Sequence, residues 1–296
     1  MAIELLRTLL FVPGNRPRML ARAESAGADA LVLDLEDAVP GSEKVAARRL
    51  VQAWVPRLAA AGRTVFVRVN APRTGLARAD VRAAVRAGVA GVVVPKAESA
   101  QDLRDLDVLL REAEMARRIR PGDIGTIPII ESARGLLRCE EIAGASDRIV
   151  ALSLGGEDYT AELGALRDAR GAALAHLRYT VVTVAVANGL PAIDTPWVDT
   201  RDVRGLAAEA RLARSIGFKG KYVIHPDQVA AVSNAFTPSR EEVAEARRVV
   251  AAAKRGAAGG RGSVSIGGRM IDAPVVERAR RVLAAAEAME ARREST

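Results

Sequence analysis

The chain has 296 residues, a formal net charge of +8, one cysteine and two histidines. A single cysteine excludes an internal disulfide and any cysteine cluster around zinc or iron–sulfur, and it is consistent with a reducing, cytoplasmic compartment. No apolar run approaches the ~20 residues of a membrane span, so we expect no membrane association.

The positive charge has two interpretations. It can indicate an anionic partner such as a polyphosphate ligand or nucleic acid. It can also reflect Ala/Arg-rich helices whose basic faces are solvated. The basic residues are spread along helix-like segments, and aromatic residues make up only 3% of the chain. Single-stranded nucleic acid needs aromatic stacking platforms, so we expect no nucleic-acid partner.

Strand-like and helix-like segments alternate along most of the chain. The strand-like segments are near-continuous apolar runs, as expected for parallel strands covered on both faces. They span residues 8–13, 30–37, 64–70, 91–96, 126–131, 148–158, 191–196 and 221–226. Eight such units predict a (β/α)8 TIM barrel, with an open doubly wound sheet as the alternative.

The pattern changes near residue 237, so we predict a barrel domain over 1–237 and a C-terminal helical extension or lid over 238–296. Within the extension, a helix leads into a Gly-rich linker at 256–262. A hairpin in "SVSIGGRMI" and a last helix from about Pro274 follow.

Charged residues and glycines gather where the predicted strands end. In a TIM barrel the active site lies at these carboxyl ends. Any one such charge can also belong to a structural ion pair, but their convergence on one rim favours a site. The candidates are Arg16, Glu36, Asp37, Arg68, Lys96, Glu131, Gly155, Gly156, Glu157 and Asp158.

Glu131 and Asp158 end two adjacent predicted strands, 126–131 and 148–158. Because neighbouring strands lie about 4.8 Å apart, both carboxylates can reach one ion. Two carboxylates suit Mg²⁺, or Mn²⁺, and leave coordination positions for water and substrate oxygens.

Arg68, at the end of the third strand, can clamp a carboxylate or stabilise a developing oxyanion. It can equally form a buried ion pair with Glu36 or Asp37. The amides of Gly155 and Gly156 can approach an anion closely because glycine has no side chain. Arg16 and Lys96 are positively charged and lie at predicted strand ends, so they are predicted to meet an anionic part of a ligand. Cys139 is predicted to serve packing.

Several segments together resemble one family. They are "TLLFVPGNRPRML", "DALVLDLEDAVP", "VFVRVN", "GVVVPKAES", "PIIESARGL", "LSLGGEDY" and "GKYVIHPDQV", in this order between residues 7 and 250. They are similar to motifs of the citrate lyase beta-subunit-like family within the HpcH/HpaI aldolase superfamily. The resemblance implies a Mg²⁺-containing barrel that cleaves or forms carbon–carbon bonds in CoA thioesters of hydroxy acids. It implies Glu131 and Asp158 as metal ligands and a substrate contact for Arg68.

The tail "GRMIDAPVVERARRVL" resembles the C-terminal segment of malyl- and citramalyl-CoA lyases. That resemblance implies that Asp272 sits on a lid and reaches the active site of a neighbouring subunit. It also implies that the subunits form a homotrimer or hexamer. An aspartate ahead of a helix is also an ordinary cap.

Two alternatives to a stand-alone CoA-thioester lyase stay open. One is the beta subunit of a citrate lyase complex, acting on an acyl-carrier thioester. The other is a non-catalytic basic binding protein.

Overall fold

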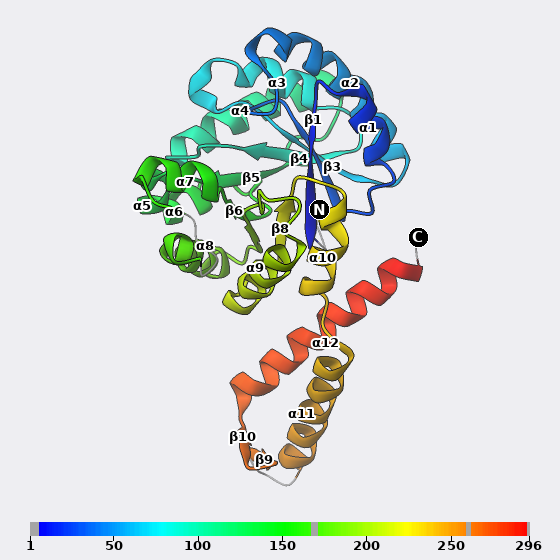
Figure 1. Cartoon of the computed structure of the whole chain (residues 1–296), viewed down its shortest axis with the longest axis vertical. Helices are drawn as coiled ribbons and strands as arrows, with labels where there is room; N and C mark the ends of the chain where they lie inside the picture. The colour runs from blue at the N-terminus through cyan, green and yellow to red at the C-terminus, as the bar shows by residue number, and fades with distance from the viewer. Residues whose placement is uncertain (1–5, 167–170, 259–261, 295–296) are drawn as a thin grey trace. The chain divides into compact units, whose positions relative to one another are not determined.

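The computed structural model describes residues 6–166, 171–258 and 262–294, with side chains described up to residue 291. Eight parallel strands close into a barrel in chain order (Figure 1). Leu9 of the first strand pairs with Ala30 of the second and with Tyr222 of the last, which closes the ring. The predicted (β/α)8 barrel is confirmed, and the open sheet is wrong. The strands are β1 (Thr8–Pro13), β2 (Ala30–Asp34), β3 (Thr64–Arg68), β4 (Val89–Val94), β5 (Gly125–Ile130), β6 (Leu152–Leu154), β7 (Ala192–Asp194) and β8 (Gly220–Val223).

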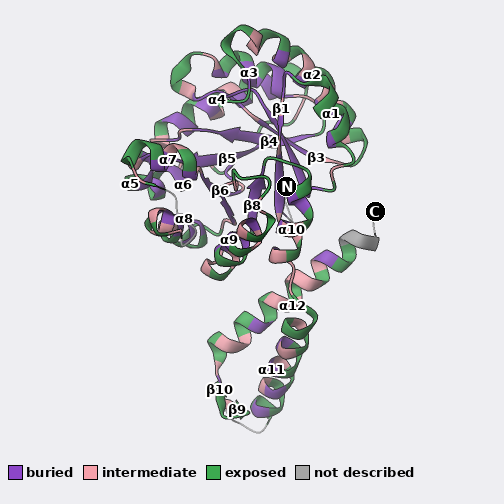
Figure 2. Ribbon diagram, in the orientation of Figure 1, coloured by how far each residue is buried: buried purple, intermediate pink, exposed green. Residues whose placement is uncertain are grey.

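The strands are buried because helices cover their outer face while their side chains fill the barrel interior. Strands β2, β4 and β5 are buried along their whole length (Figure 2). The interior cluster includes Leu9, Val32, Phe66, Ile127 and Tyr222, each at most 2% exposed. Apolar runs without alternation are therefore what this architecture requires.

The surrounding helices follow the predicted order. They are α1 (Pro17–Ala23), α2 (Lys44–Ala60), α3 (Ala77–Ala84), α4 (Ala100–Arg117), α5 (Ala133–Leu137), α6 (Cys139–Ala143), α7 (Gly156–Leu163), α8 (Ala175–Ala187), α9 (Val203–Ile216) and α10 (Asp227–Phe236). Single turns of 3-10 helix occur at η1 (Gly41–Glu43), η2 (Pro72–Thr74) and η3 (Ala172–Leu174). No helix in these described ranges is both long and apolar enough to cross a bilayer.

Five of the strands, β2, β3, β6, β7 and β8, are shorter than predicted, and for β2 and β6 this changes where candidate site residues lie. β2 ends at Asp34, because the Asp34 carboxylate accepts hydrogen bonds from the amides of Glu36 and Ala38 and turns the chain. β6 ends at Leu154, and α7 begins two residues later. Glu36 therefore lies in a loop, whereas Glu157 and Asp158 lie in the first turn of a helix.

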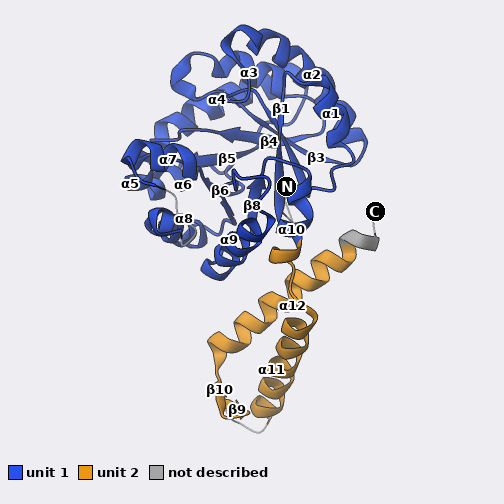
Figure 3. Cartoon of the chain, viewed as in Figure 1, with its two compact units in different colours: residues 1–233 blue, residues 234–296 orange. Residues whose placement is uncertain are grey.

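The chain divides into two compact units between Ser233 and Asn234, inside α10 (Figure 3). The second unit contains α11 (Arg240–Ala258), the antiparallel strands β9 (Val264–Ile266) and β10 (Arg269–Ile271), and α12 (Ala273–Glu294). The predicted hairpin and last helix are thus present. Residues 256–258 of the predicted linker continue α11, and residues 259–261 lie outside the described residues.

Candidate active site at the carboxyl ends of the strands

A cavity of about 370 Å³ opens beside the carboxyl ends of β3, β4 and β5. Its wall contains three predicted site residues together with five that the sequence analysis did not single out. The lining residues are Ala71, Arg73, Lys96, Glu98, Glu131, Ser132, Asp158 and Glu162. Both predicted metal ligands therefore face one cavity.

Glu131 directly follows β5 and is only 4% exposed. Its Oε1 accepts a hydrogen bond of 2.6 Å from the backbone amide of Lys96. Burial, together with the nearby negative charge of Asp158, raises the pKa of Glu131 to about 8. A buried carboxylate next to a second carboxylate is stabilised in its charged form by a cation between them.

Gly155 allows Glu131 and the first turn of α7 to lie against each other. A Cβ atom at position 155 would lie 2.1 Å from Glu131 Oε2, so no other residue fits there without a shift. The amide of Gly155 donates to the carbonyl of Ile130, and that of Gly156 donates to Thr195 Oγ1. In this structure the two glycines serve close packing, and their role in substrate binding stays a prediction.

The donor set fits a hard divalent cation. Glu131 supplies a buried carboxylate, and Asp158 supplies a second one that is 45% exposed. Among the described residues, no group of three or more His, Cys, Asp or Glu side chains is placed to hold a metal. A site built from two carboxylates suits Mg²⁺, which keeps several waters and takes substrate oxygens as further ligands.

Lys96 links the acidic residues of this rim. Its Nζ lies 2.7 Å from Glu36 Oε1, 3.5 Å from Asp37 Oδ1 and 4.0 Å from Asp158 Oδ1. Burial lowers the pKa of Lys96, but the hydrogen bond to Glu36 and the surrounding carboxylates raise it by more, so the ammonium stays charged. For the acid Glu36 burial has the opposite effect and raises the pKa, although the positive charge of Arg68 opposes the shift. The sequence analysis thus grouped Glu36, Asp37 and Lys96 correctly in space, while their substrate contacts stay predictions.

Arg68 lies in a buried ion-pair network. Its Nη1 is 3.1 Å from Glu36 Oε2, and its guanidinium carbon lies 4.6 Å from the ring centre of Phe11. Arg68 also donates two hydrogen bonds, of 2.7 and 2.6 Å, to the carboxylate of Asp34. The predicted alternative of an ion pair with Glu36 is confirmed. Asp34 was missed, although an aspartate that closes a buried apolar strand was a signal for it.

Comparison with known proteins identifies the family. Residues 7–226 match the HpcH/HpaI aldolase/citrate lyase family. The chain belongs to this family. It is 39% identical to the citrate lyase subunit beta of Escherichia coli strain K12 over 281 residues, covering 95% of this chain and 93% of that protein. It is 32% identical to the mitochondrial citramalyl-CoA lyase of Mus musculus over 287 residues, covering 94% and 85%.

The structure resembles that of CitE from Mycobacterium tuberculosis in complex with magnesium, acetoacetate and coenzyme A. The TM-score is 0.80 and the identity 36%, over 96% of this chain and 99% of that one. The predicted family is therefore confirmed, and the chain is a lyase of the HpcH/HpaI family. This result favours an enzyme over the non-catalytic binding protein.

The remaining predicted site residues are Arg16, Glu157 and Asp272. Arg16 is exposed and immediately precedes α1, and no hydrogen bond or ion pair among the described residues joins its side chain to the network around Lys96. Glu157 is exposed at the start of α7. Asp272 lies in the second unit, where its Oδ1 accepts a hydrogen bond of 3.3 Å from the Val275 amide at the start of α12. The predicted cap is present there, and the catalytic role of Asp272 stays a prediction.

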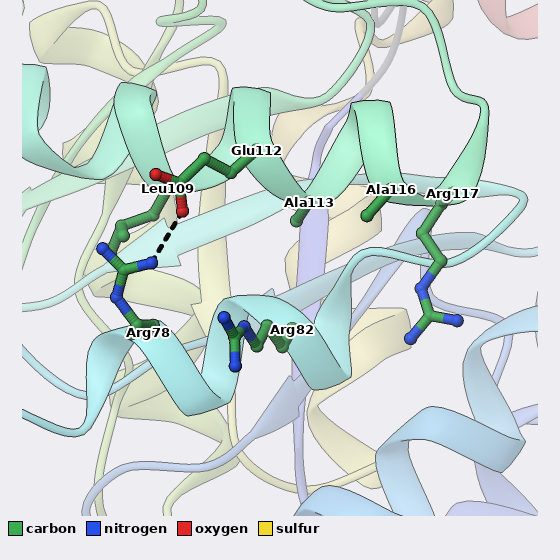
Figure 4. A pocket seen from close by; sticks show the side chains of 7 residues that line it. All are labelled: Arg78, Arg82, Leu109, Glu112, Ala113, Ala116 and Arg117. Atoms are coloured by element: carbon green, nitrogen blue, oxygen red, sulfur yellow. Dashed lines mark hydrogen bonds and ion pairs between the residues drawn. The ribbon is translucent and has the colours of Figure 1, made fainter.

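Two other cavities differ in chemistry from the one at the strand ends. A cavity of about 350 Å³ in the second unit is lined by Asp272, Lys254 and Arg280 among others. A groove of about 290 Å³ lies between α3 and α4, with Arg78, Arg82 and Arg117 along it (Figure 4). Neither lining contains two carboxylates, so neither resembles a site for a hard cation.

Proposed function

We propose that the chain is a Mg²⁺-dependent lyase that cleaves, or forms, a carbon–carbon bond in a hydroxyacyl-CoA thioester of the malyl-CoA or citramalyl-CoA type. The observation that carries this proposal is the pair Glu131 and Asp158 on one cavity wall together with the cation Lys96. Lys96 is linked to the second cation, Arg68, through their shared partner Glu36. The ligands named for the mycobacterial CitE structure, which are magnesium, acetoacetate and coenzyme A, support it. Mn²⁺ would occupy the same oxygen ligands.

The residues divide the chemistry between them. Glu131 and Asp158 would hold the metal, which, when bound, supplies Lewis-acid polarisation and a template for the substrate oxygens. Arg68 would donate a hydrogen bond to the oxygen that gains negative charge as the bond breaks. Its guanidinium is held in place by Asp34 and Glu36 and stays charged, because their charges raise its pKa by more than burial lowers it.

Cleavage also needs a base for the substrate hydroxyl. We assign this role to Asp272 of a neighbouring subunit in a homotrimer or hexamer. The hydroxyl proton passes to Asp272, the carbon–carbon bond breaks, and a 2-keto acid forms together with the enolate of acetyl-CoA. Protonation of that enolate gives acetyl-CoA, and condensation follows the same steps in reverse.

The beta subunit of a citrate lyase complex is the second candidate. The similarity to the Escherichia coli subunit, over 95% of this chain and 93% of that protein, supports it equally well. In that case the substrate would be a citryl thioester on an acyl carrier, and the products would be oxaloacetate and an acetyl thioester.

A panel of thioesters separates the candidates. Malyl-CoA, citramalyl-CoA, citryl-CoA, a citryl-carrier thioester and the free acids malate and citramalate are each incubated with the protein, with Mg²⁺ or with a chelator. We expect cleavage of a CoA thioester by the protein alone, lost on chelation. Cleavage of the carrier thioester only would favour the subunit, and equal turnover of free malate or citramalate would exclude a thioester substrate. Full activity after chelation would contradict the metal site.

A further inference from the structure

Lys96 has an unusual backbone conformation. Its φ is 51°, in the left-handed region, and in the described ranges Arg118 is the only other non-glycine residue with a positive φ. Arg118 is the C-cap of α4, where left-handed residues are common. Lys96 follows β4 instead, so no helix end accounts for its conformation. Such a conformation persists where the surrounding contacts hold it.

Contacts hold Lys96 on both sides of its backbone. Its amide donates to Glu131 Oε1 at 2.6 Å. Its carbonyl accepts from Nη2 of Arg73, in η2, at 2.9 Å. Nη1 of Arg73 in turn donates a hydrogen bond of 2.6 Å to Glu98 Oε2. Arg73 therefore forms a bridge between the loop after β3 and the Lys96 backbone that contacts Glu131.

We infer that Arg73 is a positioning residue for the metal site: by binding the Lys96 carbonyl, it keeps the Lys96 amide directed at Glu131. This inference rests on the proposed role of Glu131 as a metal ligand. Partners behind a metal ligand fix its orientation, and their loss typically costs about 10–100-fold in metal affinity. Arg73 acts through one further residue, so we expect a loss near the lower end of that range.

The direction of the effect separates this role from a simple charge effect. Arg73 is a cation on the wall of the cavity that contains Glu131 and Asp158. If its charge alone mattered, its removal would reduce repulsion and tighten binding of a divalent cation. If it positions the Lys96 backbone, its removal weakens binding.

Arg78 provides a matched control. It is 53% exposed, against 52% for Arg73, and it also pairs with a glutamate, Glu112, at 2.6 Å (Figure 4). It lies in α3, whose groove with α4 contains neither proposed metal ligand. The variants Arg73→Ala and Arg78→Ala remove the same charge and a similar ion pair, but only the first removes a contact to the Lys96 backbone.

The first experiment measures the Kd of Mn²⁺ for the full chain by electron paramagnetic resonance. We expect Arg73→Ala to bind Mn²⁺ about 10-fold more weakly than wild type, and Arg78→Ala to match wild type. Unchanged or tighter binding by Arg73→Ala would overturn the inference while leaving the metal site intact. Absence of binding by the wild type would instead overturn the metal site and, with it, this inference.

The second experiment needs no metal. Hydrogen exchange of the metal-free protein is followed in a peptide that contains the Lys96 amide. Since Arg73→Ala releases the Lys96 carbonyl, we expect faster exchange at Lys96, and no change at the barrel strands or in Arg78→Ala. The charge-conserving variant Arg73→Lys should protect the Lys96 amide better than Arg73→Ala. Equal protection of Lys96 in Arg73→Ala and wild type would contradict the positioning role.

Discussion

Asp34 and Arg68 are register partners at the carboxyl ends of β2 and β3, and their side chains form a two-pronged ion pair. Nε of Arg68 lies 2.7 Å from Oδ1 of Asp34, and Nη2 lies 2.6 Å from Oδ2. A planar guanidinium matches a carboxylate in this way, whereas an ammonium does not. The pairing of β2 with β3 thus sets where the Arg68 guanidinium lies.

We predict that Arg68→Lys lowers kcat about 100-fold, because the lysine keeps the charge but loses the forked geometry. Steady-state kinetics and thermal unfolding should be measured together. Arg68→Ala should also cost about 3–5 kcal/mol of stability, since it leaves Asp34 buried without its partner. A fall in Tm with kcat preserved in Arg68→Lys would show that the pair is structural only.

We predict that Glu131→Gln and Asp158→Asn each weaken Mn²⁺ binding by more than about 100-fold, because a direct ligand should matter more than its outer partners. Glu162→Gln is the control. Glu162 lines the same cavity, but its Oε2 accepts a hydrogen bond of 2.9 Å from the Ala133 amide. A similar loss of affinity in all three variants would point to general electrostatics rather than to two specific ligands.

Cys139 provides a pH-dependent prediction. Burial raises the pKa of this thiol to about 12, whereas the thiol of the unfolded chain ionises near pH ~8.5. The folded form therefore holds the proton more tightly. The contribution of the protonated thiol to the free energy of unfolding is fully present below pH ~8.5. It is lost as pH rises toward about 12, by roughly 1.4 kcal/mol for each pH unit.

Urea unfolding can be measured between pH 8 and pH 11 in steps of ~1 pH unit. The contribution of the thiol would then be seen as a difference between the free energies of unfolding of wild type and Cys139→Ala. The alanine variant lacks the thiol, so its stability should fall less steeply with pH. Parallel curves for the two proteins would mean that the thiol ionises equally in both states. We also expect native Cys139 to react slowly with thiol reagents at neutral pH, since the reactive thiolate is scarce.

Asp272 should act in the active site of a neighbouring subunit. Asp272→Asn tests this role cleanly, because asparagine caps a helix as well as aspartate does but lacks the charge. We predict an inactive variant with unchanged Tm. Mixed with Asp158→Asn and reassembled, it should regain roughly a quarter of wild-type activity if subunits assort at random. Full activity of Asp272→Asn would show that Asp272 serves only as a helix cap. A mixture that stays inactive although subunits demonstrably exchange would mean that Asp272 acts in the active site of its own chain.

The sequence allowed the barrel to be predicted because parallel strands buried on both faces need long apolar runs, and those runs recur before each helix. It also grouped several residues of the candidate site. The strand ends of a barrel share one rim, so Glu36, Arg68, Lys96 and Glu131 could be grouped without coordinates. Asp158 was predicted at a strand end, whereas it lies in the first turn of α7, which begins soon after β6.

Tertiary structure decided which of these side chains contact each other. The Arg68–Asp34 pair depends on the register of β2 against β3, and a shift by one residue would turn Asp34 to the opposite face. The Arg73 contact joins two loops, and the left-handed conformation of Lys96 leaves no mark in residue type. Apolar patterns are local and periodic, so the sequence by itself determined the barrel and its rim. Contacts between loops depend on the packing of the whole chain, so only the folded structure determined the network that orients Glu131.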